Sequence, residues 1–188
     1  ELARCPYRYF LHRLLRLDPP PQPSEPGLWL DPMVRGGLLH EVFAEFMRQM
    51  RSEREKPSPW NHAERLTRLM DDGLDRIALL LPPPSRHAGE AERAGLLQDL
   101  KAFLEAEADA PEREPVGLEV AFGQAGDPRE TLGTLDAVPL DLGSGLKLLL
   151  KGQIDRIDRI GGSSHYEVVD YKTGRPWTRE RRRARFHG

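Results

Sequence analysis

The first 110 residues carry apolar side chains at helical spacing. This spacing predicts helices over four segments: 1–17, 33–54, 60–81 and 87–108. The second segment has the clearest apolar stripe, formed by Leu38, Leu39, Val42, Phe43, Phe46 and Met47. Proline-containing segments separate the helices, at 18–32, 57–59 and 82–84. Residues 1–110 are therefore expected to form a mainly helical part.

From about residue 111 the pattern becomes that of β-strands. Strand-like runs cover 116–122, 132–140, 146–160 and 166–171, and the second of these is the weakest. The third is expected to be one long strand, onto which the fourth pairs back in antiparallel fashion after a Gly-Gly-Ser-Ser turn. The basic run 179–185 would open another helix. The expected class is α/β, a central mixed sheet in residues 111–188 flanked by helices, with the N-terminal helical part added.

Length and composition place limits on what the chain can be. Its 188 residues suit one domain covering 1–188, and a charged fraction of 31% with a formal net charge of −2 shows no overall basic excess. No apolar run approaches membrane-spanning length, no signal peptide is visible and there is one cysteine, which favours the cytoplasm. No G-x-x-x-x-G-K-[ST] phosphate loop occurs, which excludes a helicase motor in this segment. Because the chain begins with Glu1, we interpret it as a domain of a longer protein.

The strongest candidates for catalysis lie between residues 151 and 175. Asp170 and Lys172 are two positions apart, so on a strand their side chains point to one face, and Asp155 lies on the preceding strand. Two carboxylates about 4 Å apart repel by roughly 4 kcal/mol at an effective dielectric constant of 20, and a divalent cation removes this penalty. We therefore expect Asp155 and Asp170 to bind Mg²⁺ or Mn²⁺, and Lys172 to orient the attacking water. The alternative is a solvated edge strand with a surface Asp170–Lys172 ion pair.

Four segments together resemble a known family. They are Cys5–Leu11 (CPYRYFL), Arg35–His40 (RGGLLH), Gly152–Asp158 (GQIDRID) and Val168–Gly174 (VVDYKTG). In this order they resemble the RecB-type branch of the PD-(D/E)XK nucleases, and the first resembles the start of the nuclease domain in AddB-type helicase–nuclease subunits. The resemblance implies a restriction-endonuclease-like fold and metal-dependent hydrolysis of DNA by a bacterial helicase–nuclease subunit in double-strand break repair and recombination.

The resemblance also assigns roles to individual residues. It implies that His40 approaches the metal, although a lone histidine at the start of an apolar stripe is otherwise more typical of a core or capping residue. It implies the backbone carbonyl of Tyr171 as a further metal ligand, which suits the oxygen ligands that Mg²⁺ prefers. Glu119, on the strand before the two acidic ones, is a third carboxylate of the site or a structural ion-pair partner. Asp158 lies on the opposite face from Asp155 and is expected to be a surface or ion-pair residue.

Two features depart from the family pattern. In AddB-type relatives a cysteine at the position of Cys5 joins three others in a [4Fe–4S] cluster, but this chain has no other cysteine, so a cluster requires residues outside it. Within these 188 residues we expect Cys5 to be a small buried hydrophobe. The Q-x-x-x-Y motif that follows the D-x-K strand in the family is also missing, as if the last helix were truncated. Activity of the isolated segment is therefore in question.

Candidate DNA contacts are two groups of arginines near the ends of the sequence. One group, Arg4, Arg8 and Arg16, recurs every four or eight residues, and the other is Arg179, Arg181 and Arg182. The alternative for the first group is that it forms a solvent-exposed face of a helix without contacting DNA. The expected partners are single-stranded DNA ends and a helicase–nuclease partner subunit. The alternatives are a stand-alone single-strand exonuclease of the CRISPR-adaptation kind and a non-catalytic DNA-binding or scaffold module.

Overall fold

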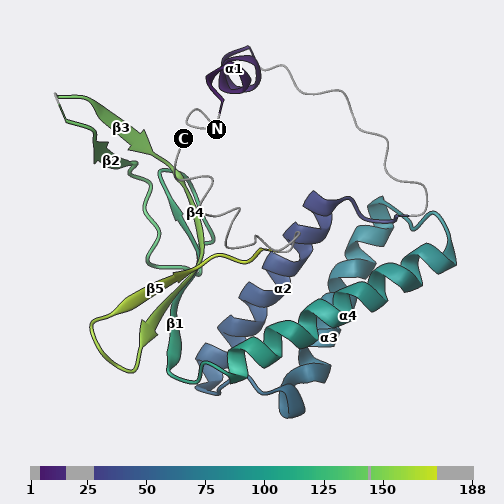
Figure 1. Cartoon of the computed structure of the whole chain (residues 1–188). Helices are drawn as coiled ribbons and strands as arrows, with labels where there is room; N and C mark the ends of the chain where they lie inside the picture. Colours follow the sequence, from purple (N-terminus) through teal and green to yellow (C-terminus); the bar gives the residue numbers. More distant parts are fainter. Residues whose placement is uncertain (1–4, 16–27, 144, 173–188) are drawn as a thin grey trace, which may run out of the picture.

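The structure is a computed structural model that describes residues 5–15, 28–143 and 145–172. Its helices, in chain order, are α1 (Pro6–Tyr9), the π-helix η1 (Phe10–Leu14), α2 (Pro32–Glu53), α3 (Pro59–Leu80) and α4 (Arg86–Ala108). Its strands are β1 (Arg113–Phe122), β2 (Val138–Asp141), β3 (Lys147–Leu150), β4 (Gly152–Ile160) and β5 (Tyr166–Val169). Figure 1 shows α2, α3 and α4 side by side, with the strands on one side of this helical layer.

The three long helices begin where the sequence provides local signals. Asp31 caps α2, because its carboxylate accepts hydrogen bonds from the backbone N–H groups of Met33 and Val34 at 2.8 and 3.1 Å. Pro32 occupies the first turn, where a missing N–H has no consequence. Ser85 caps α4 in the same way, by accepting from the Ala88 N–H at 3.1 Å. These caps, and the proline in the first turn of α3, explain why the helices start within one residue of the predicted positions.

The hydrophobic core lies between the helices and β1. All six residues of the predicted α2 stripe are buried, together with Leu66 and Met70 from α3, Leu96, Leu100, Phe103 and Leu104 from α4, and Leu118 from β1. The rings of Phe43 and Phe103 stack with their centroids 4.1 Å apart. This packing fixes α2 against the sheet and therefore fixes the position of its polar residues.

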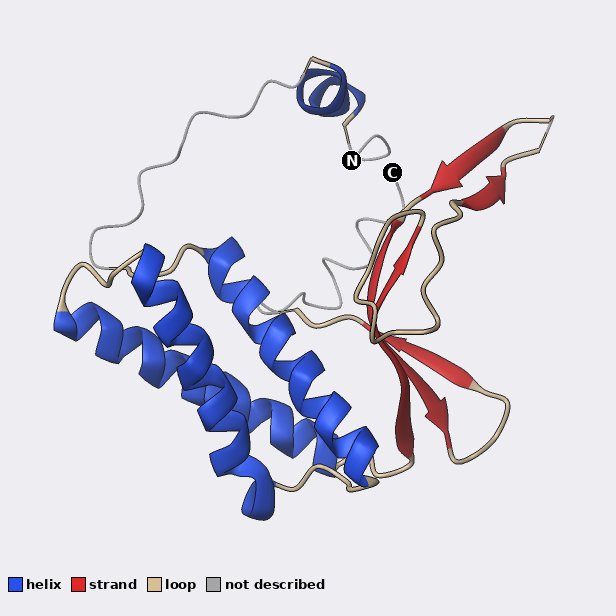
Figure 2. Ribbon diagram, turned by 180° about the vertical axis from the view of Figure 1, so that it is seen from behind, coloured by secondary structure: helices blue, strands red, loops and turns tan. Residues whose placement is uncertain are grey.

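The main sheet has the strand order β1-β4-β5, and both pairings are antiparallel. Leu118 pairs with Arg156 and Val120 with Ile154, while Arg156 also pairs with Val169 on the other side. Among the described residues, parallel pairing is limited to an isolated bridge between Phe122 and Thr134. The helices lie on one side of this sheet, as Figure 2 shows from behind. The expected α/β class is confirmed.

The prediction of one long strand over residues 146–160 is wrong. The run is two strands, β3 and β4, separated by Lys151, and β3 pairs with β2 in a separate two-stranded sheet. Packing at the break is close: a Cβ on Gly123, whose φ is +69°, would lie 2.6 Å from the Cβ of Lys151. The apolar pattern continues across the break, so only the change of pairing partner reveals it. The weak strand signal over 132–140 corresponds to β2, which starts later.

The N-terminal segment also differs from expectation. Its described part is a four-residue α1 followed by the π-helix η1, where one regular helix was predicted over 1–17. Cys5 is half-buried, so the expectation of a buried hydrophobe is also wrong. The expected helix at 179–185 lies outside the described residues. None of the helices in the described ranges combines the length and the hydropathy needed to cross a lipid bilayer.

Candidate metal centre

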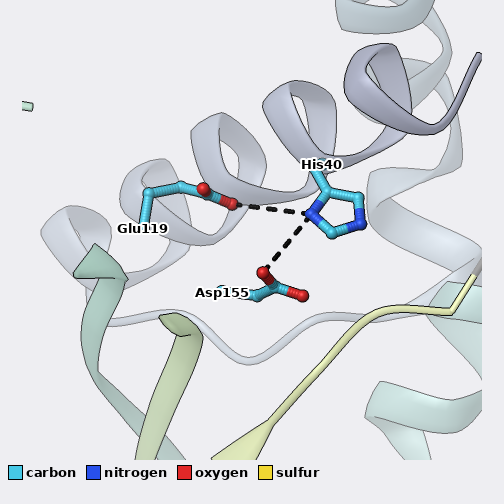
Figure 3. A group of neighbouring side chains, drawn as sticks. All are labelled: His40, Glu119 and Asp155. Carbon is cyan, nitrogen blue, oxygen red and sulfur yellow. Dashed lines mark ion pairs between the residues drawn. The ribbon is translucent and has the colours of Figure 1, made fainter. Parts of the chain in front are cut away.

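Three polar side chains from three different elements converge beside α2. His40 comes from α2, Glu119 from β1 and Asp155 from β4 (Figure 3). His40 Nδ1 lies 3.5 Å from Asp155 Oδ1 and 4.0 Å from Glu119 Oε1. One ligand atom from each residue lies within 4.8 Å of the other two. An imidazole nitrogen and two carboxylate oxygens at this spacing form a candidate site for a divalent cation.

The register of the sheet brings the two carboxylates together. The pairs Leu118–Arg156 and Val120–Ile154 flank Glu119 and Asp155, which therefore face each other across β1 and β4. Facing residues of an antiparallel pair point to the same side of the sheet, and like charges there repel. His40 is held above them because the apolar face of α2 packs into the core. A sequence pattern alone cannot reveal this register.

Glu119 has two features that local structure does not explain. Its φ is +54°, in the left-handed region that favours glycine and is strained for other residues. Its Oε2 accepts a hydrogen bond from the side-chain amide of Gln153, but its Oε1 is buried and has no hydrogen-bond partner among the described residues. A buried carboxylate oxygen is normally hydrogen-bonded, so the Glu119 Oε1, which faces His40 and Asp155, is suited to bind a cation.

The electrostatics agree with this interpretation. Burial raises the pKa of Glu119, and the negative charge of Asp155 raises it further. Burial also raises the pKa of Asp155, against the lowering effect of a backbone hydrogen bond from Tyr171 and the charge of His40, and Asp170 adds repulsion. The ionised carboxylates are thus disfavoured in the protein alone, and a cation would relieve both the desolvation and the repulsion.

Tyr171 connects two of these residues through its backbone. Its N–H donates to Asp155 Oδ2 at 2.7 Å, and its carbonyl oxygen lies 3.1 Å from His40 Nε2. With the ring proton on Nε2, His40 donates to this carbonyl and directs Nδ1 at the carboxylates. Histidines that bind metals usually donate their other N–H to such an acceptor. In this arrangement the Tyr171 carbonyl orients His40, whereas the resemblance implied that it binds the metal directly.

Asp170 and Lys172 lie at the edge of the group. They form an ion pair with each other, and their side chains are 56% and 63% exposed. The negative charge of Asp170 contributes to the raised pKa of Asp155. The strand predicted over 166–171 is shorter than expected, because β5 ends at Val169, and among the described residues it has only β4 beside it.

Several polar residues near the site were missed or misjudged. The sequence pattern does not identify Gln153, whose side-chain amide donates a hydrogen bond to Glu119. Asp158 was expected on the opposite face from Asp155 as a surface or ion-pair residue; it is fully buried and paired with Arg156. The two-residue alternation along β4 places Arg156 and Asp158 on one face, but it cannot show that helices cover that face. The surface interpretation is therefore wrong and the ion pair is present.

A groove with a volume of about 600 Å³ runs beside the three residues. Its lining includes Gly36, Gly37, His40, Arg48, Arg129 and Gln153. Both arginines are engaged: Arg48 lies 3.1 Å from Asp127, and Arg129 pairs with Asp127 and Glu45 at 2.8 and 2.9 Å. Of the predicted DNA contacts, Arg4, Arg16, Arg179, Arg181 and Arg182 lie outside the described residues, and the side chain of Arg8 is not described either.

Comparisons with known proteins relate the chain to nucleases. A family model described as the PD-(D/E)XK nuclease superfamily matches residues 1–186. The chain is similar to bacterial proteins named as one of the subunits of an ATP-dependent helicase/deoxyribonuclease. The relative from Symbiobacterium thermophilum is 31% identical over 183 residues, 91% of this chain, and the one from Clostridium acetobutylicum is 28% identical over 186 residues, 93% of this chain. The chain spans only 14% and 15% of the length of these two relatives.

Proposed function

The chain belongs to the PD-(D/E)XK nuclease superfamily, and we propose that it hydrolyses phosphodiester bonds in DNA with Mg²⁺ or Mn²⁺. The cation would be held by His40, Glu119 and Asp155, with Asp170 as an additional carboxylate beside them. The observation that carries this proposal is the buried Oε1 of Glu119, which faces His40 and Asp155 and has no hydrogen-bond partner in the described part of the chain. Hard oxygen ligands and few protein contacts are typical of Mg²⁺ sites.

Each residue of the site has a defined task in the proposed reaction. A bound cation supplies Lewis acidity toward the phosphate and lowers the pKa of the attacking water. Tyr171 holds the Asp155 carboxylate through its N–H and orients His40 through its carbonyl. Lys172 is exposed beside Asp170, so its ammonium group can reach a phosphate or position the water as the negative charge develops.

The relatives suggest where such a nuclease works. Their name combines a helicase with a deoxyribonuclease, and we propose that this chain also acts as an exonuclease on single-stranded DNA ends, with a helicase–nuclease partner subunit, in the bacterial cytoplasm. We also propose a role in double-strand break repair and recombination. A [4Fe–4S] cluster at Cys5 would need three thiolates from outside these 188 residues.

Two experiments test the proposal. The first is a titration of the chain with Mn²⁺, measured by calorimetry, and the second is digestion of end-labelled single-stranded DNA. Glu119→Gln removes one charged ligand and should weaken Mn²⁺ binding by at least about tenfold, since even outer-shell changes reach this size. Glu114→Gln is the control, because this carboxylate lies on the same strand but pairs with the exposed Arg159. A wild-type chain that binds no Mn²⁺ would contradict the proposal and favour a non-catalytic DNA-binding module.

Gly37 offers a separate test that the groove receives DNA. It lies inside α2, where glycine is less stable than alanine by about 1 kcal/mol, yet no atom lies within 4 Å of the place that a Cβ would take. Packing among the described residues therefore does not require glycine here. We expect Gly37→Ala to raise the free energy of unfolding by up to about 1 kcal/mol and to weaken single-stranded DNA binding, because the methyl group obstructs close approach to the helix.

The control for this test is Gly95→Ala. Gly95 lies inside α4, and an added Cβ there would make an ordinary contact 3.6 Å from the Arg35 guanidinium. It should gain similar stability without a change in DNA affinity. Both quantities are measured by urea unfolding and by fluorescence anisotropy with labelled DNA at two salt concentrations. Equal DNA affinities of both variants and the wild type would show that DNA does not approach α2 at Gly37.

A further inference from the structure

Next to Asp155, β4 carries a buried cluster of charges that includes Arg156 and Asp158. The Arg156 side chain is 1% exposed, and its carboxylate partners Asp158 and Glu107 are 0% and 8% exposed. Arg156 Nε donates to Asp158 Oδ1 at 2.6 Å, and Arg156 Nη1 lies 2.8 Å from Glu107 Oε1. A buried ion-pair cluster is weak evidence for a role in stability, because apolar residues of similar volume often stabilise a protein equally well. The cluster therefore calls for another explanation.

Tyr171 links this cluster to the cation site. Its hydroxyl oxygen accepts a hydrogen bond from Arg156 Nη1 at 3.2 Å, and its ring packs 5.2 Å from that of Phe43 and 5.9 Å from that of Phe103. Its backbone N–H and carbonyl contact Asp155 and His40, as described above. One residue thus has its side chain on the buried charges and its peptide groups on two candidate metal ligands.

The position of Tyr171 depends strongly on these contacts. β5 ends at Val169, so residues 170–172 continue beyond the hydrogen-bonded part of the strand. Among the described residues, the contacts that hold this segment to the rest of the molecule are made largely by Tyr171. A small movement of its ring would shift both peptide groups, and with them the orientation of Asp155 and His40.

We propose that Arg156 is a positioning residue that sets the geometry of the cation site through Tyr171. This inference rests on the proposed function, since it presumes that the site binds a divalent cation. Arg156 is itself fixed by two buried carboxylates, so its guanidinium presents one defined donor to the hydroxyl. The hydrogen bond to the hydroxyl fixes the distance of Tyr171 from β4. The N–H and carbonyl of Tyr171 then hold Asp155 and His40 in the orientation that binds the cation.

The test uses Mn²⁺ alone and compares affinity and electron paramagnetic resonance spectra among variants of the 188-residue chain. Tyr171→Phe keeps the ring in the core and removes only the hydroxyl, so the fold should be retained. We expect its Mn²⁺ affinity to fall by about tenfold, the lower end of the effect of losing an outer-shell partner, with a changed spectrum. Tyr166→Phe, at an exposed position on β5, is the matched control and should bind as the wild type does.

A double-mutant cycle shows whether Arg156 acts through Tyr171. Arg156→Lys keeps the charge but loses the planar donor group, and it should weaken Mn²⁺ binding in the same way. If Arg156 acts through the hydroxyl, Arg156→Lys combined with Tyr171→Phe should be no weaker than Arg156→Lys alone. Two results would overturn the inference while the proposed function stands, provided that the wild type binds Mn²⁺. One is additive losses of affinity in the double variant, and the other is unchanged Mn²⁺ affinity in Tyr171→Phe. A wild type that binds no Mn²⁺ would overturn both.

Discussion

Asp155→Asn is expected to lower Mn²⁺ affinity by at least about 100-fold and to abolish cleavage, because it removes a charged ligand at the centre of the site. The free energy of unfolding without metal should stay the same or rise. Burial and the neighbouring charge of Asp170 make the ionised Asp155 unfavourable, and an amide carries no charge. The asparagine oxygen can still accept the hydrogen bond from the Tyr171 N–H, so the local structure is preserved.

Calorimetric titration with Mn²⁺ and urea unfolding without metal measure the two effects separately. Asp75→Asn is the control, because Asp75 is exposed on α3, a helix that contributes no residue to the cation site. It should leave Mn²⁺ affinity unchanged. Wild-type Mn²⁺ affinity in a folded Asp155→Asn protein would remove Asp155 from the site, and a marked loss of stability would show that the carboxylate is structural.

Arg156→Met is expected to cost ~3–5 kcal/mol of stability, which is the usual result of leaving buried charges without their counter-charge. Asp158 and Glu107 would remain in the interior without the positive charge of Arg156. This loss is a large share of the 5–15 kcal/mol that keeps a typical domain folded, so the variant will be partly unfolded at moderate temperature. Adding Glu107→Gln and Asp158→Asn should recover part of the loss, because the uncompensated charges are then gone.

A matched control lies on the same strand. Arg159 pairs with Glu114 at 2.7 Å, but both side chains are exposed. Arg159→Met should therefore change stability by no more than about 1 kcal/mol. Urea unfolding followed by circular dichroism measures both variants. Similar small losses from Arg156→Met and Arg159→Met would mean that water or other groups compensate the carboxylates of the cluster.

Helices α2, α3 and α4 could be predicted from the sequence with little error. The signals for α2, α3 and α4 are local: an apolar stripe at helical spacing, a proline in the first turn or a serine or aspartate cap, and a proline-rich stretch between them. The motif residues His40, Asp155, Asp170 and Lys172 could also be named in advance, as could the nuclease family. All of these depend on residues close together in the chain or on short motifs.

Tertiary structure alone decided how the site is built. Glu119 could not be assigned from the sequence, because its role depends on facing Asp155 in the sheet register and on its left-handed backbone. The break at Lys151 depends on a change of strand partner, and the burial of Arg156 depends on the helices that cover β4. Desolvation and pairing arise between residues that are distant in the chain. A local pattern of apolar and polar positions contains neither, so it identifies candidate ligands but not their geometry.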